Sequence, residues 1–401
     1  MSVDHVLYGT CVHQLSAGLM LTLAIFSSAG PLSIDMYLPG LPQLQQELGT
    51  TPGAVQLTIS AFMIGMAVGN LLFGAISDGT GRKRPLIIAS VIFFLTSVAC
   101  ALAPTIATLI AARFLQGLAG GCVIVVSRAV VPDIVHGVAA ARAFSALQAL
   151  SGFMPAFAPA IGGLLIPSVG WRGVFWVLAG VNLLQLVVAL RMPETLPAEK
   201  RSPGALSGLA SRIWRCLQHP VFVGYMLAGS LGFGALFAYI SGSPLVLQVQ
   251  LGQSPTAYAF TFGAIALLFP ISNALNMRVV RSVAPRKVLV WALLIDACVT
   301  TILIILSLTR PSLVPVVACL AILAMMSGFI SANAAALAVE EIRAIGAGAG
   351  SGAMGFAQFL IAGVVPALVG LGSNHALTMS VVSLVCAGAA FAGMQVLTRA
   401  K

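Results

Sequence analysis

The sequence predicts an all-helical integral membrane protein, with twelve transmembrane helices in two six-helix halves. Of its 401 residues, 59% are hydrophobic and only 7% are charged, and the mean hydropathy is +1.04. A soluble domain carries roughly 25% charged residues, so lipid must solvate most of this chain. Because a bilayer-crossing helix needs about 20 apolar residues, the length suffices for about twelve spans joined by short loops.

The apolar runs give the expected positions of these helices. No basic segment precedes the first run, and no Ala-x-Ala-like cleavage site follows it. We therefore expect a retained span and not a signal peptide. The runs fall at 15–40, 54–77, 85–104, 106–130, 142–166, 172–192, 219–243, 256–277, 287–309, 312–335, 348–371 and 375–398.

The longest polar stretch, 193–218, separates six apolar runs from six others. We expect an N-terminal six-helix half over 1–192, a central cytoplasmic linker over 193–218 and a C-terminal six-helix half over 219–401. Transporters built from repeats have this plan. In them the substrate binds near the membrane midplane between the halves, and rocking of one half against the other gives alternating access.

The basic residues predict how the chain is oriented in the membrane. Lys and Arg concentrate in cytoplasmic loops. If the N-terminus is cytoplasmic, only Arg172 and Arg310 of the 20 Lys and Arg residues fall outside, and Arg113 falls within a span. We therefore expect a multi-pass protein of the inner, cytoplasmic membrane with both termini in the cytoplasm. The net charge of +10 then reflects topology, and no nucleic-acid partner is expected.

The sharpest local motif lies between the second and third apolar runs. Its sequence is Gly74-Ala-Ile-Ser-Asp78-Gly-Thr-Gly81-Arg82-Lys83-Arg84. The three cations alone would indicate an ordinary positive-inside loop. The complete pattern is a glycine, an aspartate four residues later and then Gly-Arg-Lys. It resembles the signature between the second and third helices of the major facilitator superfamily.

This resemblance implies that the loop is a conformational latch. Asp78 would cap the N-terminus of a helix in the other half, and Arg82 would pair with an acid near the end of the fourth helix. Asp133 is the acid available there. The gating residues expected in and near this loop are Gly74, Asp78, Gly81, Arg82, Lys83 and Asp133.

Arg113 lies several residues inside the fourth apolar run. A cation at the centre of a span costs at least ~2.5–3.5 kcal/mol, so the side chain needs an internal face and a partner or water. Snorkelling to the membrane surface is the alternative. The stretch that Arg113 begins resembles the fourth-helix motif of the superfamily, in which the arginine is linked to proton coupling.

Asp35 is the only carboxylate of the first apolar run. Burial and a nearby cation pull the protonation of a carboxyl group in opposite directions, and a proton carrier requires that competition. We expect Asp35 to carry the proton, with Arg113 at a similar depth as its neighbour. The alternative is that Asp35 caps the end of its helix, beside the turn that contains Pro39.

The fifth run contains a motif with paired glycines and helix-breaking prolines. The stretch is Gly152-Phe-Met-Pro155-Ala-Phe-Ala158-Pro159-Ala-Ile-Gly162-Gly163. It resembles the motif associated with antiporters of the superfamily, although Ala158 stands where the family usually has glycine. We add Pro159 and Gly162 to the expected gating residues.

Four segments spread over nearly the whole chain resemble the Bcr/CflA group of drug-resistance transporters. They are Asp35-Met-Tyr-Leu-Pro-Gly-Leu-Pro42, Trp171-Arg-Gly-Val-Phe-Trp176, Asn333-Ala-Ala-Ala-Leu-Ala338 and Ala347-Gly-Ala-Gly-Ser-Gly-Ala-Met-Gly-Phe-Ala-Gln-Phe359. This resemblance implies proton-coupled efflux of small amphiphilic antibiotics such as chloramphenicol-like compounds. Ser27 stands where some related exporters carry a second acid, and Pro132 stands where the family often has a basic residue.

A drug pocket is mostly apolar with few polar groups. Our candidates are aromatic, methionine and amide side chains of the inner helices, and plain helix packing is the alternative for each. They are Phe26, Met36, Tyr37, Met63, Tyr225, Phe237, Tyr239, Asn333 and Gln358.

The function expected from the sequence is proton-driven drug efflux by a monomer, with no cofactor or metal beyond the proton gradient. Proton-coupled uptake of a small nutrient by the same fold is the alternative. An intramembrane enzyme would need a polar catalytic pair, and the sequence offers only Asp35, Arg113 and Asp296 as full charges within the spans. The sequence has no H-E-x-x-H, G-x-S-x-G or P-loop motif, so we expect no enzyme.

Overall fold

The computed structural model describes residues 17–135, 137–202, 204, 207–309, 312–342 and 347–398. Arg310 lies outside them. Within the described chain, 11 helices are long and apolar enough to cross a membrane. One of these, Ser151–Arg191, contains two helices joined at Gly170, whose φ of 66° lies outside the helical region. The described chain therefore has twelve spans, and the predicted all-helical membrane fold is confirmed.

The first span is broken into short helices by its own sequence. Pro31 lacks an N–H, and its ring conflicts with the carbonyl four residues earlier. Ser28 also donates its hydroxyl to the carbonyl of Ala24 at 2.8 Å, a bond that often bends helices.

The N-terminal helices are α1 (Ala17–Ser27), α2 (Ala29–Asp35), η1 (Leu38–Gly40), α3 (Leu41–Glu47), α4 (Pro52–Thr80), α5 (Lys83–Ala101), α6 (Ile106–Ile134) and α7 (Gly137–Arg191).

The second group follows a segment that contains two short helices, η2 (Ala198–Lys200) and α8 (Leu209–Leu217). Proline begins three of the longer helices after this segment, α9, α10 and α12, at a position where a missing N–H carries no penalty. The helices are α9 (Pro220–Pro244), the π-turn η3 (Leu245–Gln250), α10 (Pro255–Ala266), α11 (Leu268–Val279), α12 (Pro285–Leu308), α13 (Leu313–Glu341), α14 (Ala347–Val369) and α15 (His375–Thr398).

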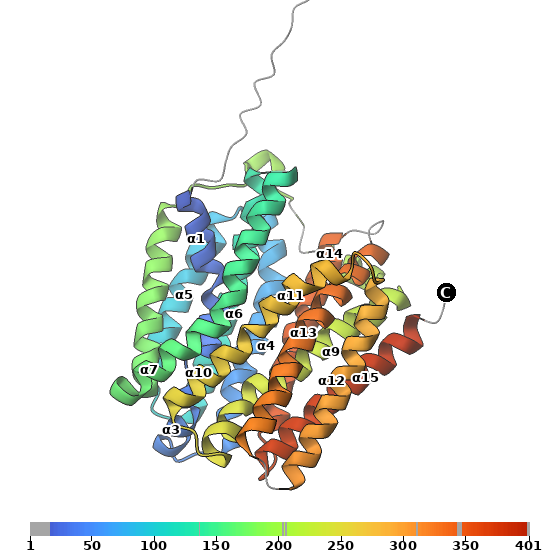
Figure 1. Cartoon of the computed structure of the whole chain (residues 1–401). Helices are drawn as coiled ribbons and strands as arrows, with labels where there is room; N and C mark the ends of the chain where they lie inside the picture. Colours follow the sequence, from blue (N-terminus) through green and yellow to red (C-terminus); the bar gives the residue numbers. More distant parts are fainter. Residues whose placement is uncertain are drawn as a thin grey trace, which may run out of the picture.

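The two groups of helices stand side by side. Helices α1 to α7, coloured blue to green, form one side of the bundle, and α9 and α12 to α15 form the other (Figure 1). The yellow α10 begins beside α7, and α11 crosses from there toward the orange helices. We call the end that carries the α4–α5 loop and the α7–α9 segment the linker end, which is uppermost in Figure 1. The other end, which carries α3, is called the opposite end.

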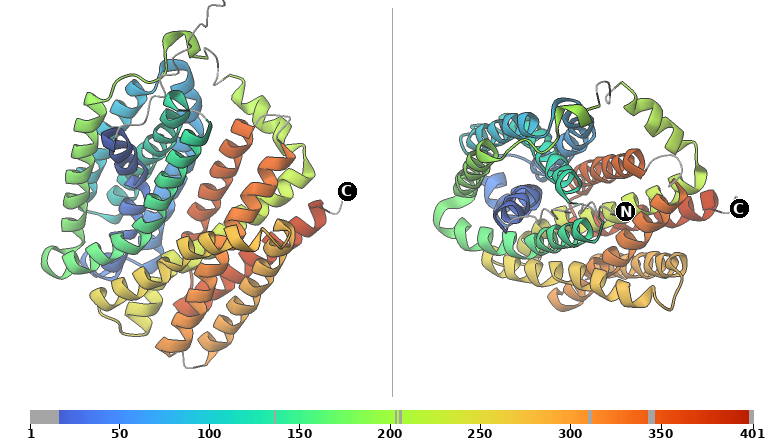
Figure 2. Two further views of the ribbon diagram at one scale, coloured as in Figure 1. Left: turned by 45° about the horizontal axis from the view of Figure 1, so that its top comes forward. Right: turned by 90° about the horizontal axis from the view of Figure 1, so that it is seen from above.

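Close contacts join the two groups toward the opposite end. Gln56 of α4 donates its side-chain amide to the carbonyl of Ser241 in α9 at 2.7 Å. Thr256 of α10 donates its hydroxyl to the carbonyl of Gly163 in α7 at 3.0 Å. Gly53 and Gly370 bring the ends of α4 and α14 into backbone contact. Helix α10 packs along α7, and both views of Figure 2 show this yellow segment beside the green one.

Candidate functional site

Asp35 ends α2 and is buried, with 4% of its surface exposed. Among the described residues, no side chain or backbone group hydrogen-bonds to its carboxylate. The short helix that follows it, η1, contacts α9 and α10 of the other group of helices, and the carboxyl lies near the hydroxyls of Tyr239 in α9 and Tyr258 in α10. The Tyr258 hydroxyl is bonded to Ser243 at 3.0 Å, whereas the Tyr239 hydroxyl has no partner in the described chain. Asp35 thus lies where the two groups of helices meet.

Arg113 of α6 is fully buried inside the N-terminal group. Its Nη1 donates to the carbonyl of Ser33 at 3.0 Å and to Oε1 of Gln116 at 2.6 Å. The guanidinium carbon lies 4.7 Å from the ring centre of Tyr37 and 4.2 Å from that of Phe62. Aromatic faces attract a cation by ~2 kcal/mol or more when the contact is desolvated. The Nε and Nη2 groups find no acceptor among the described residues.

A buried chain of amides and hydroxyls holds Arg113 in place. Gln116, which accepts from Arg113, donates to the hydroxyl of Ser97 in α5 at 2.7 Å. Asn182 of α7 donates to the same hydroxyl at 2.7 Å. Buried polar groups that satisfy one another fix the geometry of their members. This network links three helices, α5, α6 and α7, around the cation.

Arg113 and Asp35 form no ion pair in this structure, and the expected coupling between the two charges stays a prediction. The first span presents Ser33 and Tyr37 to Arg113. Residues four apart share one helix face, whereas residues two apart lie about 200° around the axis. Asp35 therefore points away from α6 and toward α9 and α10. The carbonyl of Ser33 and the aromatic rings are the neighbours that Arg113 finds instead.

Gly162 and Pro159 lie where α7 crosses the first span. A Cβ on Gly162 would collide with the carbonyl oxygen of Met36, the residue after Asp35. Glycine at this position lets the two backbones touch, as small residues do between membrane helices. Pro159 is buried one turn earlier in the same helix. Both residues therefore touch or flank the segment that carries Asp35, and their gating role stays a prediction.

The loop between α4 and α5 forms a compact charge cluster at the linker end. Arg82 is 6% exposed, and its Nε donates to Oδ2 of Asp133 at 2.9 Å. Its Nη1 donates to Oδ1 of Asp78 at 2.6 Å and to the hydroxyl of Ser77 at 2.8 Å. The expected contact between Arg82 and Asp133 is present. Asp78, by contrast, bonds to Arg82 and is half exposed. The family resemblance had implied that Asp78 would instead cap the N-terminus of a helix in the other half.

The charge cluster contains one further acid, Glu194, which the sequence reasoning missed. Its carboxylate accepts the backbone N–H of Arg82 at 2.8 Å and that of Lys83 at 3.2 Å. These N–H groups begin α5, and an acid at a helix N-terminus is stabilising. Gly81 makes room, because its φ of 94° favours glycine and a Cβ there would collide with Glu194. The signal was the acid in Pro193-Glu-Thr directly after the sixth apolar run.

The protonation of this cluster follows from its contacts. Burial alone would lower the pKa of Arg82, but the hydrogen bonds and charges of Asp133 and Asp78 raise it above the ordinary value. Burial alone would raise the pKa of Glu194, but the backbone N–H groups it accepts, from Arg82 first, hold it below the ordinary value. Both side chains are therefore charged at neutral pH, and each stabilises the loop in its ionised form.

The nine expected substrate residues do not form one group. Six of them, Phe26, Met36, Tyr37, Met63, Phe237 and Tyr239, belong to the larger buried apolar core. Tyr225 belongs to a second core inside the C-terminal group. Asn333 donates its side-chain amide to Oδ1 of Asn276 at 2.7 Å. Gln358 is partly exposed. Tyr37 contacts the Arg113 guanidinium through its ring, and Tyr239 lies near Asp35.

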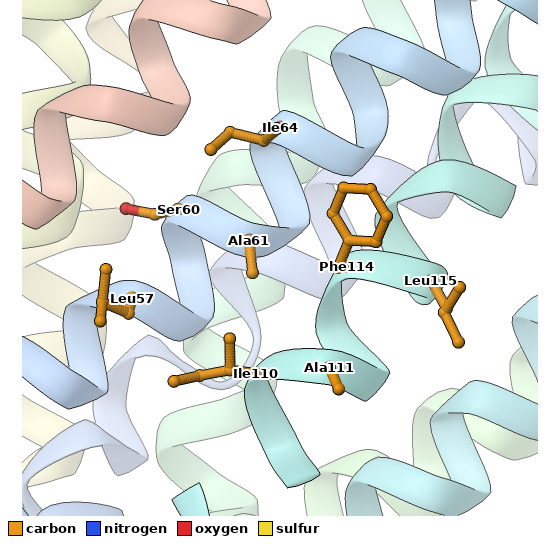
Figure 3. A pocket seen from close by; sticks show the side chains of 8 residues that line it. All are labelled: Leu57, Ser60, Ala61, Ile64, Ile110, Ala111, Phe114 and Leu115. Atoms are coloured by element: carbon orange, nitrogen blue, oxygen red, sulfur yellow. The ribbon is translucent and has the colours of Figure 1, made fainter. Parts of the chain in front are cut away.

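A groove of about 580 Å³ lies between α4 and α6 (Figure 3). Its walls are almost entirely apolar, and none of the expected substrate residues lines it. The residues that line it are Leu57, Ser60, Ala61, Ile64, Ile110, Ala111, Phe114 and Leu115. Leu57 and Leu115 are exposed on the bundle surface, so this groove faces the lipid and not the interior around Asp35.

Asp296 of α12 is fully buried, and both of its carboxylate oxygens lack a hydrogen-bond partner among the described residues. It lies inside the C-terminal group near Cys386 of α15, and no contact among the described residues connects it to Asp35.

Comparison with known proteins places the chain in a family. The model of the Major Facilitator Superfamily matches residues 21–366. The chain belongs to the Major Facilitator Superfamily. The chain is therefore a membrane transporter and not an enzyme, as expected.

Two relatives show which members of the Major Facilitator Superfamily the chain resembles. It is 34% identical, over 91% of both chains, to the uncharacterized MFS-type transporter YdgK of Bacillus subtilis (strain 168). It is 29% identical to the bicyclomycin resistance protein homolog of Haemophilus influenzae, over 87% of this chain and 88% of the relative. The expected resemblance to Bcr-type resistance proteins is confirmed.

The fold matches solved structures of the superfamily. A bacterial homolog of the human lysosomal transporter Spinster, in an inward-facing and unoccupied conformation, superposes with a TM-score of 0.75. The match covers 95% of this chain and 96% of that chain at 15% identity. At this identity the likeness shows the fold alone.

Proposed function

We propose that the chain exports small amphiphilic drugs in exchange for protons, with Asp35 as the proton carrier. The observation that carries the proposal is the position of Asp35. It is a buried carboxyl group with no hydrogen-bond partner in the described chain, at the contact between the two groups of helices. An ionisable side chain inside a membrane span is expensive and marks an ion or substrate pathway.

The surroundings of Asp35 support alternating loading and release of a proton. Tyr239 and Tyr258 belong to the C-terminal group, so rocking of that group changes the distance from Asp35 to two hydroxyl groups. A hydroxyl can donate to an ionised carboxylate or accept from a protonated one. Movement of the two groups would therefore alter the stability of the charged form, which is what coupling to a proton gradient requires.

The orientation that we propose places the linker end in the cytoplasm. Positive-inside placement of the basic residues supports it. The described contacts between the two groups lie toward the opposite end. In this arrangement a drug would enter between the two groups from the cytoplasm or the inner leaflet. The name of the Haemophilus relative, which refers to bicyclomycin resistance, supports a drug as cargo.

The test uses purified protein in liposomes with an imposed pH gradient and a pH-sensitive dye inside. Addition of a transported drug should dissipate the gradient with wild-type protein, and Asp35→Asn should abolish this flux. Asp35→Glu, which keeps a titratable group, should retain part of it. Full proton-driven transport by Asp35→Asn would refute the assigned role of this carboxyl.

The direction of transport separates export from the alternative, nutrient uptake. An export-deficient bacterial host that expresses the protein should become more resistant to a panel of amphiphilic antibiotics, and Asp35→Asn should not confer this resistance. If susceptibility is unchanged across the panel while uptake of a small nutrient into the same cells becomes dependent on the proton gradient, the protein is an importer.

A further inference from the structure

The linker carries a short amphipathic helix whose outer surface faces away from the bundle. Helix α8 packs against α14 and the beginning of α9. Cys216 is buried and Ile213 is half-buried against the second apolar core. Only two residues separate the end of α8 from Pro220, where the span α9 begins. Helix α8 therefore lies at the level at which α9 enters the membrane, and Figure 2 shows it at the rim of the bundle.

The exposed surface of α8 is divided into two flanks. Successive residues of an α-helix are rotated by about 100°. With Cys216 and Ile213 directed at the bundle, Trp214 and Leu217 fall on one flank, and Arg212 and Arg215 fall on the other. Trp214 is 65% exposed and Leu217 is 38% exposed. One flank is therefore apolar and aromatic, and the other is basic.

These two flanks fit the boundary between hydrocarbon and headgroups. Tryptophan gathers at membrane interfaces because its ring is apolar and its N–H is polar. Arginine side chains close to an anionic leaflet are attracted to lipid phosphates. A helix that lies in the interface buries its apolar face among acyl chains and directs basic residues at the headgroups.

We propose that α8 is a membrane-interface anchor that binds anionic phospholipid headgroups. Trp214 and Leu217 enter the acyl region, while Arg212 and Arg215 contact the lipid phosphates. The anchor holds the second part of the linker in the plane of the membrane, beside the linker-end starts of α9 and α14. The proposal needs only that the chain spans a bilayer, so it stands apart from the proposed direction and cargo of transport.

The experiment measures lipid contacts at Trp214 by fluorescence quenching. The full chain is placed in bilayers of phosphatidylcholine and phosphatidylglycerol, in which either lipid carries bromine atoms on the acyl chain near the glycerol. The chain has four tryptophans, so the signal of Trp214 is the difference between wild type and Trp214→Phe. Trp291→Phe, which removes a tryptophan 64% exposed on α12, is the matched control.

Two results are expected. Trp214 should be quenched by shallow bromine atoms, and brominated phosphatidylglycerol should quench it more than brominated phosphatidylcholine, by roughly fivefold in local lipid occupancy. Arg212→Gln/Arg215→Gln should bring that ratio close to one. Arg278→Gln/Arg281→Gln, which removes two exposed cations from the end of α11 and the residues after it, should leave it unchanged.

Three outcomes would overturn the proposal. Absence of shallow quenching at Trp214 would show that the helix lies in water. Equal quenching by the two lipids in wild type would show that α8 has no preference for anionic headgroups. An equal loss of preference in both arginine double variants would assign the effect to the net charge of the protein. A single elution peak in size-exclusion chromatography verifies the fold of each variant. If Arg212→Gln/Arg215→Gln aggregates, the single variant Arg215→Gln takes its place.

Discussion

Arg82 and Arg113, two buried arginines of the N-terminal group, differ in how completely they are paired. At the linker end, Arg82 contacts two carboxylates and a hydroxyl. In the membrane interior, Arg113 has one nitrogen bonded, to a carbonyl and an amide, and its other two groups have no acceptor in the described chain. A fully paired charge stabilises one arrangement. An incompletely paired one keeps hydrogen-bonding capacity that a change of conformation or a ligand can use.

The same contrast applies to the acids. Asp133 and Glu194 at the linker end each accept hydrogen bonds from the α4–α5 loop or its flanks. Asp35 accepts none from the described residues and faces two tyrosines of the other group of helices. We therefore assign stability to the linker-end cluster and proton chemistry to the interior, and the following predictions test that division.

The largest contrast should come from replacing each arginine by methionine. Arg82→Met leaves Asp133 buried without its partner, and breaking such a pair costs about 3–5 kcal/mol. Arg113→Met loses the contacts of the guanidinium with the aromatic rings, but it also removes N–H donors that are buried without an acceptor, and the two effects oppose each other. The free energy of unfolding of this variant should therefore differ from that of wild type by less than about 2 kcal/mol. Unfolding in detergent, followed by tryptophan fluorescence, measures both.

Transport should show the reverse order. Arg113→Met should lose proton-driven transport at least tenfold while remaining folded, and Arg113→Lys should recover little because a lysine cannot present the planar guanidinium to the rings. Comparable destabilisation by Arg82→Met and Arg113→Met, with comparable residual transport, would contradict the division between the two regions.

A second prediction concerns the pairing partner of Arg82. Asp133→Asn should destabilise the protein by more than Asp78→Asn, because the Asp133 side chain is 11% exposed and that of Asp78 is 50% exposed. Exposed ion pairs contribute only about 0–1 kcal/mol. Each carboxyl variant is also combined with Arg82→Met. Thermal unfolding of the single and double variants gives the coupling energy of Arg82 with each acid. A coupling to Asp78 that equals the coupling to Asp133 would be inconsistent with the observed burial.

A third prediction concerns the turn that receives Glu194. Gly81→Ala places a side chain at a φ of 94° and against the Glu194 carboxylate. We expect a loss of about 1–3 kcal/mol in the free energy of unfolding. Gly79→Ala, two residues away, meets only a contact at 3.5 Å with the Ser202 carbonyl and is the matched control. Equal losses for the two variants would argue against the clash with Glu194.

The smallest expected effect is a pH dependence. The pKa of Glu194 lies below its ordinary value of 4.5 in the folded protein. Its stabilisation is therefore fully present above the ordinary pKa and is lost as the pH falls through the lower, folded pKa. Wild type and Glu194→Gln should differ in unfolding temperature at neutral pH and converge in acid. A gap that widens below pH ~4 would reverse the sign and refute the assignment.

The sequence by itself determined the features that depend on local pattern. Apolar runs, proline starts and polar loops located the spans, because the hydrocarbon thickness fixes the length of a crossing helix. The family resemblance carried by the motif at Gly74–Arg84 also implied the contact between Arg82 and Asp133, which the structure contains. Twelve spans were recognisable even where α7 runs on through Gly170.

Only the tertiary structure decided which way each side chain faces. Asp35 and Arg113 are close in depth, yet the rotation of the first span presents Ser33 and Tyr37 to Arg113 and turns Asp35 toward Tyr239 and Tyr258. That rotation is set by packing against α6, α7 and α10, including the contact of Gly162 with Met36. A membrane helix is hydrophobic on nearly all sides, so its sequence pattern does not indicate which face is turned toward the interior of the bundle. Contacts between residues far apart in the chain, such as Glu194 with Arg82, were likewise settled by the fold.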